Sequence, residues 1–240
     1  MDDPPRIQSK KTSPRRQNAS GITLIDYSHE RPFEDWKAED IFRYLKTALA
    51  RQPMDLEIST LIVRELKIRD GDVKRARVEI KQSGGQEISW HNGVRYRVQS
   101  LRDQFEPSNK YPKNCKVYFI LLTKDRETPK PWGIYIGQTS KKIEKRFSVH
   151  LDENDKLGSR IVRRRGWQLL YGLCNLIPAM TYKDSCRFEG LLLDAFAGEH
   201  NWKPLRKLPP NRVKGAGPLE YRKKNQPIEV LGATPKKEGL

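Results

Sequence analysis

The sequence predicts an α+β protein in which two ordered blocks lie between polar, basic ends. Apolar residues with helical spacing fill the first block, and a continuous apolar run followed by an alternating one predicts a small antiparallel sheet, flanked by helices, in the second. The stretch FEPSNKYPKN at 105–114 contains prolines and turn-forming residues, which is typical of a joint. The predicted parts are a flexible tail at 1–32, a helical domain at 33–104, a sheet domain at 114–211 and a second flexible tail at 212–240.

Three stretches of the first block place apolar residues at near-helical spacing. The first two begin near Trp36 and Leu56, and the third runs from Asp72 to about Gln82. In the third stretch, apolar and basic residues follow helical spacing on separate faces, so one stripe should face a core and the other should face a partner. The apolar stripe consists of Val73, Ala76 and Ile80, and the basic stripe consists of Lys74, Arg77 and Lys81.

The segment EISWHNGVRYRVQ alternates apolar and polar residues around Asn92-Gly93, a dipeptide that strongly favours a β-hairpin. Such a hairpin would place Arg95 and Arg97 together on the face opposite the core. Three helices followed by a basic hairpin resemble a winged helix-turn-helix domain, whose third helix enters the major groove while the wing contacts phosphates. The alternative is a small helical domain with a solvated basic face. The winged-helix interpretation predicts DNA contacts by Lys74, Arg77, Lys81, Arg95 and Arg97.

The second block opens with the continuously apolar run 117–122, which predicts a strand covered on both faces. A polar loop leads to a second strand at 132–138, where Tyr135 lies between two glycines on one face. Glycine within a strand often marks a close approach by a ligand or another part of the chain, although a strand end that merely turns is the alternative. The two strands should pair antiparallel and bring Tyr118 near Tyr135, with WQLLYGLCNL as a third strand.

The segment SKKIEKRFSVHL predicts a helix after the second strand. Ile143, Phe147 and Leu151 recur at helical spacing and form its core face. Arg146 and His150 are one turn apart on a neighbouring face. The strands and this helix therefore gather two tyrosines, an arginine and a histidine.

These residues resemble the GIY-YIG nuclease superfamily over about 114–205. The two half-motifs correspond to KVY at 116–118 and YIG at 135–137, so the compact GIYIG run contains only the second half. A Lys-Val pair replaces the Gly-Ile of the first half, and the loop between the tyrosines is longer than is usual in the family. The helical arginine of the family corresponds to Arg146, and a histidine present in some members corresponds to His150.

The family also has an acidic metal ligand on a later helix. In TYKDSCRFEGLLLDAFAGEH, Thr181 and Asp184 form a capping box, and Glu189 shares a face with apolar residues of the helix that follows. A carboxylate on an apolar stripe is costly unless it is paired or bound to metal, so Glu189 is the metal candidate, with a salt bridge as the alternative. The resemblance makes Asn201 a polar residue near the site; the alternative is a helix cap or turn.

Composition predicts a polyanionic partner. The chain has 47 Lys and Arg against 30 Asp and Glu, a net charge of +17, which should attract nucleic acid, although ribosomal and membrane-surface proteins share this property. In the basic run RIVRRR, Arg163 and Arg164 are candidates for contacts with the DNA backbone, and the alternative is a solvated charge run.

The three cysteines have no C-x-x-C spacing, so they support neither a disulfide framework nor a zinc finger. No apolar run approaches the ~20 residues that span a bilayer, so no membrane partner is expected and the chain is predicted to be intracellular, cytoplasmic if bacterial.

The resemblance implies a metal-dependent endonuclease acting on double-stranded DNA with Mg²⁺ or Mn²⁺ and no small-molecule cofactor. Tyr118 would accept the proton of the attacking water, and His150 would relay it. Arg146 would clamp the phosphate, Glu189 would hold the metal ion, and Tyr135 would position phosphate or water. A sequence-specific enzyme of the restriction or mobile-element kind, with a homodimer on DNA as one assembly, is the leading interpretation. The alternatives are a structure-selective repair or recombination nuclease and a DNA-binding regulator with an inert nuclease fold.

Overall fold

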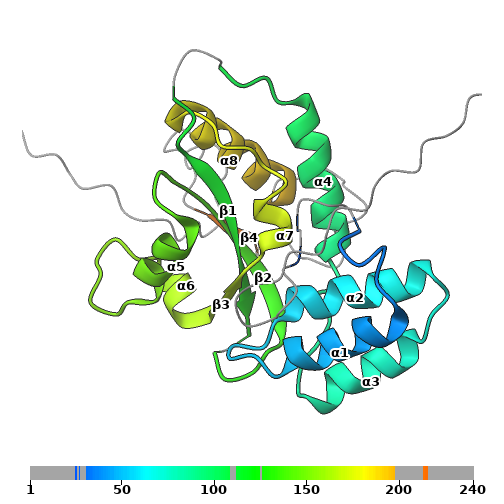
Figure 1. Cartoon of the computed structure of the whole chain (residues 1–240). Helices are drawn as coiled ribbons and strands as arrows, with labels where there is room; N and C mark the ends of the chain where they lie inside the picture. The colour runs from blue at the N-terminus through cyan, green and yellow to red at the C-terminus, as the bar shows by residue number, and fades with distance from the viewer. Residues whose placement is uncertain are drawn as a thin grey trace, which may run out of the picture.

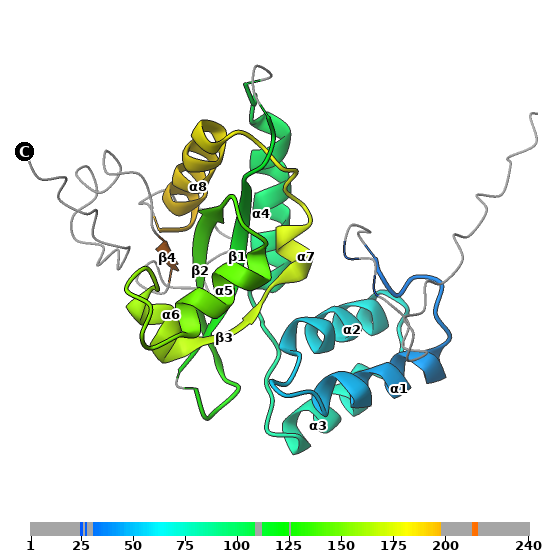
Figure 2. The ribbon, with the colours of Figure 1, turned by 60° about the vertical axis from the view of Figure 1, so that its left-hand side comes forward.

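A helical unit and a sheet unit lie side by side in the computed structural model (Figures 1 and 2). The structure describes residues 25, 27, 31–108, 112–124, 126–197 and 213–215, and it is α+β, as the sequence predicts. The helical unit contains α1 (Ala38–Leu49), α2 (Leu56–Ile68) and α3 (Val73–Gln82). The sheet unit contains α4 (His91–Gln104), β1 (Lys116–Thr123), β2 (Pro131–Thr139), α5 (Ile143–Leu151), α6 (Arg160–Arg165), β3 (Gly166–Leu169), α7 (Tyr171–Cys174), α8 (Tyr182–Ala197) and β4 (Val213–Gly215).

The three helices predicted for the first block are confirmed, and they enclose a core of their own. An aspartate side chain caps two of them: Asp55 accepts from the Ile58 N–H before α2, and Asp72 accepts from the Arg75 N–H before α3. The apolar stripe of α3 faces this core and its basic stripe is exposed, as expected of an amphipathic helix. The core includes Phe33, Ile41, Leu45, Ile62, Ala76 and Ile80.

The predicted hairpin around Asn92-Gly93 is wrong, because this segment forms helix α4. Val94 and Val98 fit the alternating pattern of a strand, but they are also four residues apart and therefore share one face of a helix. Both side chains are completely buried. Burial of that helical face against the sheet unit outweighs the local turn preference of Asn-Gly, which lies in the first turn of α4. The described residues therefore contain no wing.

Arg95 and Arg97 consequently do not lie on an exposed wing. The Arg95 side chain is buried, and its Nη1 donates to the Gly172 carbonyl of α7 at 3.0 Å. Arg97 is partly buried on the same helix. In this structure Arg95 supports the packing of α4 on α7, so the prediction that it contacts DNA from a wing is a misassignment that follows from the mistaken hairpin.

The two apolar cores divide the chain earlier than the predicted joint at 105–114. Ile88, Trp90, Val94 and Val98 belong to the same buried cluster as the strands of the sheet unit, whereas the other buried apolar residues of α1–α3, apart from Leu56, form a separate cluster. The boundary between the cores therefore lies between α3 and Ile88. Helix α4 is part of the sheet unit in its packing, although the sequence placed it with the helices before it.

The described strands form one sheet in the order β3-β1-β2-β4. The predicted antiparallel pair is confirmed, with Tyr118 of β1 opposite Gly137 of β2. Only the start of WQLLYGLCNL pairs as a third strand, β3, because the chain turns into the short helix α7 directly after it. β4 pairs parallel with β2 at Tyr135 and lies in a segment predicted to be a flexible tail, so that prediction is wrong for 213–215.

Part of the predicted N-terminal tail also packs on the folded chain. Arg31 forms an ion pair with Glu65 of α2, with 2.7 Å between Nη2 and Oε1. The Tyr27 ring lies 6.0 Å from that of Tyr171. Burial opposes ionisation of Glu65, but hydrogen bonds from Arg31 and Arg69 dominate and lower its pKa. Residues 1–24, 26 and 28–30 of this tail lie outside the described residues.

The turn before α2 joins the two units. The Trp167 indole N–H donates to the Met54 carbonyl at 2.8 Å, and the Gln168 amide both donates to Asp55 and accepts from the Leu56 N–H. Glu57, which is fully buried, accepts from the Gly172 N–H at 3.0 Å and lies 2.8 Å from His91 Nε2. Burial raises the pKa of Glu57, and the hydrogen bond from His91 opposes that shift. These contacts fix β3 and α7 against the helical unit.

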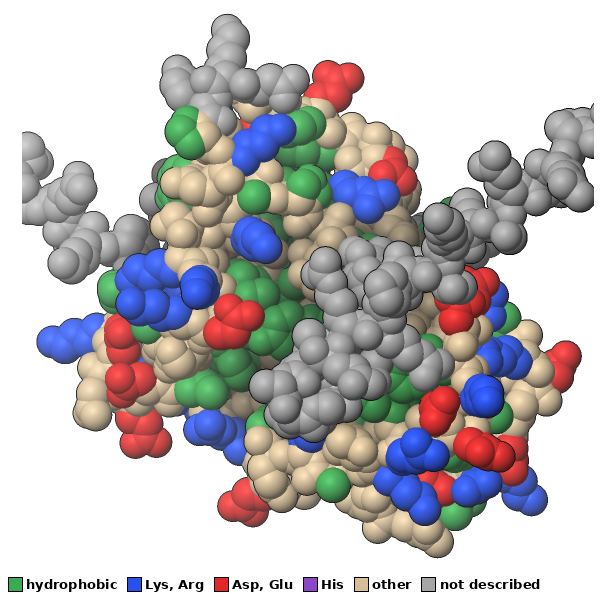
Figure 3. Space-filling view, viewed as in Figure 1, with side chains coloured by type: hydrophobic (Ala, Val, Ile, Leu, Met, Phe, Trp, Pro, Cys, Tyr) green, Lys and Arg blue, Asp and Glu red, His purple; other side chains and the backbone are tan. Residues whose placement is uncertain are grey.

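The surface shows no single dominant charged patch from the side of Figure 1. Over the helical unit, Lys and Arg side chains are interspersed with Asp and Glu (Figure 3). The net charge of +17 is therefore not concentrated on the described part of this face. Among the described helices, none is long and apolar enough to cross a membrane.

Candidate active site

Tyr118 of β1, Tyr135 of β2 and His150 of α5 lie together inside the sheet unit. The Tyr118 and Tyr135 ring centroids are 6.2 Å apart, and that of His150 is 6.1 and 5.3 Å from them respectively. All three side chains are buried. The strand register brings the tyrosines together, and the Arg146–His150 face of α5 lies against them, as the sequence predicted.

Gly137 provides the space that the Tyr118 hydroxyl occupies. A Cβ at position 137 would lie 2.6 Å from Tyr118 Oη and 2.7 Å from its Cζ, which no normal contact allows. The sequence indicated a close approach at the glycines flanking Tyr135. In this structure, the group that approaches Gly137 is the side chain of Tyr118.

A backbone hydrogen bond determines which nitrogen of His150 carries the proton. The Ser159 N–H donates to Nδ1 at 2.8 Å, so Nδ1 is unprotonated. The neutral ring therefore has its proton on Nε2, which lies 2.7 Å from Tyr118 Oη and donates to it. Burial, followed by the charge of Arg146, lowers the pKa of His150 to about 3, so the ring stays neutral near neutral pH. This geometry gives His150 a donor role in place of the expected relay.

Burial raises the pKa of Tyr118 well above its ordinary value, and Tyr135 and Glu189 add to the shift. The charge of Arg146 and its hydrogen bond to Tyr118 act in the opposite direction. Burial and then Glu189 raise the pKa of Tyr135 to about 12, again opposed by Arg146. A hydrogen bond from Tyr118 also favours the ionised form of Tyr135. Arg146 and Glu189 therefore both act on this tyrosine pair, with opposite sign.

Glu189 is held on α8, whose start is fixed by a threonine cap. The Asp184 N–H donates to Thr181 Oγ1 at 3.1 Å, as the predicted capping box requires. The Asp184 carboxylate accepts from the Thr181 hydroxyl and from the Ser108 N–H. It therefore also connects the segment after α4 to the start of α8. The Glu189 side chain is only 3% exposed, as its apolar neighbours in the sequence predicted.

The residues present fit a metal ion that the substrate helps to hold. Among the described residues, no group of three or more His, Cys, Asp or Glu side chains is placed to bind a metal ion. Mg²⁺ commonly takes one or two carboxylates and completes its shell with water and substrate phosphates. The carboxylate of Glu189 is the kind of oxygen donor that Mg²⁺ or Mn²⁺ prefers. Asn201, the other residue assigned by resemblance, lies outside the described residues.

The basic run of α6 lies next to this site, but its arginines differ in exposure and in their contacts. Arg163 donates from Nη2 to the Asp155 carbonyl at 2.8 Å, and its charge helps to lower the pKa of His150. Arg164 and Arg160 are exposed and one helical turn apart. Of the two arginines predicted to contact DNA from this run, Arg164 is therefore accessible, and Arg163 is largely committed to the loop before α6.

For the nuclease activity that the sequence resemblance implies, His150→Gln should retain a higher rate than His150→Ala. The glutamine amide can place an N–H donor near Tyr118, as Nε2–H does, but an amide cannot accept a proton in a relay. We expect a tenfold to hundredfold loss for alanine, since a hydrogen bond to a charged group contributes ~1.5–3 kcal/mol, and a smaller loss for glutamine. Single-turnover cleavage rates measure the difference. Equal losses in both variants would restore the relay interpretation.

Comparison with known proteins supplies no further guide to function. No protein-family model matches the sequence, and no curated protein and no solved structure matches this chain. The function is therefore inferred from the side chains of the site and their geometry.

Proposed function

We propose that this chain is a divalent-metal-dependent DNA endonuclease that hydrolyses phosphodiester bonds. One observation carries the proposal: Tyr118, Tyr135, Arg146, His150 and Glu189 come from two strands and two helices and act on one another electrostatically or through hydrogen bonds. Burying two phenols, an imidazole and a carboxylate together costs stability, which argues for a chemical use. Together these side chains can supply a proton acceptor, a positive charge for the phosphate and a metal ligand, which are the groups that hydrolysis of a phosphodiester requires.

Tyr118 is the general base of the proposed reaction. Its phenolate takes a proton from water as the water oxygen bonds to phosphorus; the bond from phosphorus to the leaving oxygen breaks, and that oxygen gains a proton from solvent. Burial keeps Tyr118 protonated in the free chain, so the phenolate depends on donors and positive charge around it. The His150 Nε2–H and the Arg146 guanidinium both favour the phenolate.

Arg146 and Glu189 supply charges of opposite sign. Arg146 is partly exposed, and its planar guanidinium suits a phosphate that enters beside Tyr118. Glu189 would hold Mg²⁺ or Mn²⁺, and that ion, when bound, stabilises negative charge on the phosphoryl and leaving oxygens. The charges of both groups act on Tyr135, which would orient the phosphate or the water.

Sequence-specific cleavage of the restriction or mobile-element kind is the form of the activity that we favour. The observation that supports it is the separate helical unit, which has its own core and an exposed basic stripe on α3 and is fixed to the sheet unit by α2. Such a unit can read DNA beside a catalytic unit. A structure-selective nuclease and an inert DNA-binding regulator are the competing functions that the experiment must separate.

The test is digestion of a panel of plasmids of different sequence, with Mg²⁺, with Mn²⁺ and with EDTA, followed by mapping of the ends. The parent should cut at defined sites only with a metal ion. Arg146→Ala should cut about 10²–10³-fold more slowly, because loss of a comparable charge-stabilising group has that effect. Arg126→Ala, which removes an exposed arginine from the β1–β2 loop, should cut like the parent. DNA that is bound but never cut under any of these conditions would favour the regulator.

A further inference from the structure

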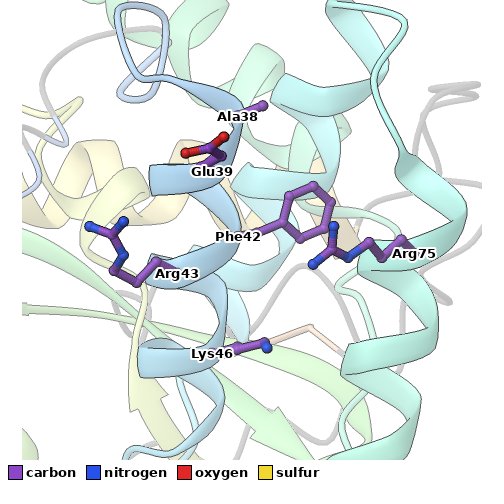
Figure 4. Close-up of a pocket in the computed structure, with 6 residues that line it drawn as sticks. All are labelled: Ala38, Glu39, Phe42, Arg43, Lys46 and Arg75. Atoms are coloured by element: carbon purple, nitrogen blue, oxygen red, sulfur yellow. The ribbon is translucent and has the colours of Figure 1, made fainter.

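A groove between α1 and α3 lies outside the candidate active site. Its volume is ≈ 370 Å³. Phe42 and Lys46 project from α1 toward α3, and Arg75 of α3 lies beside Phe42 (Figure 4). The groove is lined by Ala38, Glu39, Phe42, Arg43, Lys46 and Arg75, so three cations accompany one carboxylate.

The Arg75 side chain is supported in a defined position. Its Cζ lies 4.3 Å from the centroid of the Phe42 ring, and its Nε lies 3.3 Å from Glu79 Oε1. A guanidinium that stacks on an aromatic ring loses less freedom when it binds a ligand, and it can still donate from its Nη atoms. The side chain remains 55% exposed. Arg75 is therefore held at the groove by a ring contact and an ion pair, and more than half of its side chain remains open to an anion.

The groove is a better anion site than the basic stripe of α3 that the sequence suggested. The central member of that stripe, Arg77, forms an ion pair with Glu87, with 2.6 Å between Nε and Oε1. This contact is closer than that of Arg75 with Glu79, so more of the charge of Arg77 is neutralised within the chain. The groove combines cations from two helices with two apolar lining residues, Phe42 and Ala38, whereas the stripe runs along one helix.

We propose that this groove binds one sugar-phosphate unit of duplex DNA, with Lys46 and Arg75 at the phosphate. The deoxyribose has apolar faces that suit Phe42 and Ala38, and the phosphate suits an ammonium beside a guanidinium. Arg43 lies at the rim, where its Nη1 is 3.3 Å from Asp40. Such a contact positions the duplex without reading its sequence. The proposal rests on the proposed function only because it takes the bound DNA to be the substrate.

The experiment measures how the affinity for a fluorescein-labelled, mixed-sequence DNA duplex depends on salt, using the full chain in EDTA so that no cleavage occurs. The double variant Lys46→Ala/Arg75→Ala should reduce the slope of log affinity against log salt by about 0.9, the value for one phosphate contact, and each single variant should reduce it by part of that amount. Arg75→Lys should keep the slope because it keeps the charge. Lys67→Ala removes an exposed lysine from α2, which contributes no residue to the groove, and should keep the slope of the parent.

Two results would overturn the proposal: slopes unchanged in Lys46→Ala and Arg75→Ala, or an equal reduction in Lys67→Ala. If the DNA slope is unchanged but the groove variants lose affinity for polyglutamate, the groove binds an acidic peptide instead. Plasmid cleavage by the parent is scored separately. A parent that cuts while the slopes stay unchanged contradicts only the groove, and a parent that never cuts while the slopes fall contradicts only the nuclease.

Discussion

Glu189→Gln is expected to abolish metal-dependent cleavage while DNA binding persists. Glutamine keeps the size of the side chain and removes the negative charge that would hold Mg²⁺. The charge of Glu189 raises the pKa of both Tyr118 and Tyr135, so its removal makes the phenols easier to ionise. The proposed base is therefore not impaired. A loss of cleavage in this variant is evidence for the metal role of Glu189 and against an indirect effect on Tyr118.

Single-turnover cleavage with saturating Mg²⁺ measures this effect, and a fall of at least about 10²–10³ is expected from loss of a comparable charge-stabilising group. Glu153→Gln makes the same chemical change at an exposed position and should cut at the rate of the parent. The salt dependence of DNA binding in EDTA should match that of the parent. Undiminished cutting by the Glu189→Gln protein would show that the metal ion is held elsewhere.

Short-range patterns were sufficient to predict the strands and helices that form the site. The apolar run 117–122 and the Gly-flanked Tyr135 predict the β1–β2 pair, because alternation along a strand determines which side chains share a face. The spacing of Arg146 and His150 predicts their common face on α5. A glutamate among apolar residues predicts a buried carboxylate because its position can be read from helical periodicity alone.

Long-range contacts could not be predicted in this way. The alternation around Asn92-Gly93 fits both a hairpin and a helix, and the choice depends on what α4 packs against. Arg95 can be buried without a large cost because a carbonyl 77 residues away, at Gly172, accepts its hydrogen bond. Ser159 determines the tautomer of His150 through its backbone N–H, and every residue except proline has that group. No residue type in the sequence marks such a contact.

Tyr118→Phe is expected to fold like the parent and to lose the chemical step. Phenylalanine keeps the ring that packs against Tyr135 and His150 and removes the oxygen that would accept a proton from water. The hydroxyl fills the space above Gly137, so its removal creates no steric conflict. Tyr96→Phe, at a side chain that is 66% exposed, is the matched control and should keep the rate of the parent.

The pH dependence of single-turnover cleavage separates loss of the base from loss of packing. Because burial raises the pKa of Tyr118, the rate of the parent should rise about tenfold per pH unit from about pH 6 until the phenol ionises. His150 should add no break in this range, since its pKa of about 3 keeps it neutral throughout. In Tyr118→Phe the residual rate should lose this slope because the titrating group is absent. A variant that is slower than the parent but keeps the same slope would mean that another group accepts the proton and that Tyr118 contributes only packing.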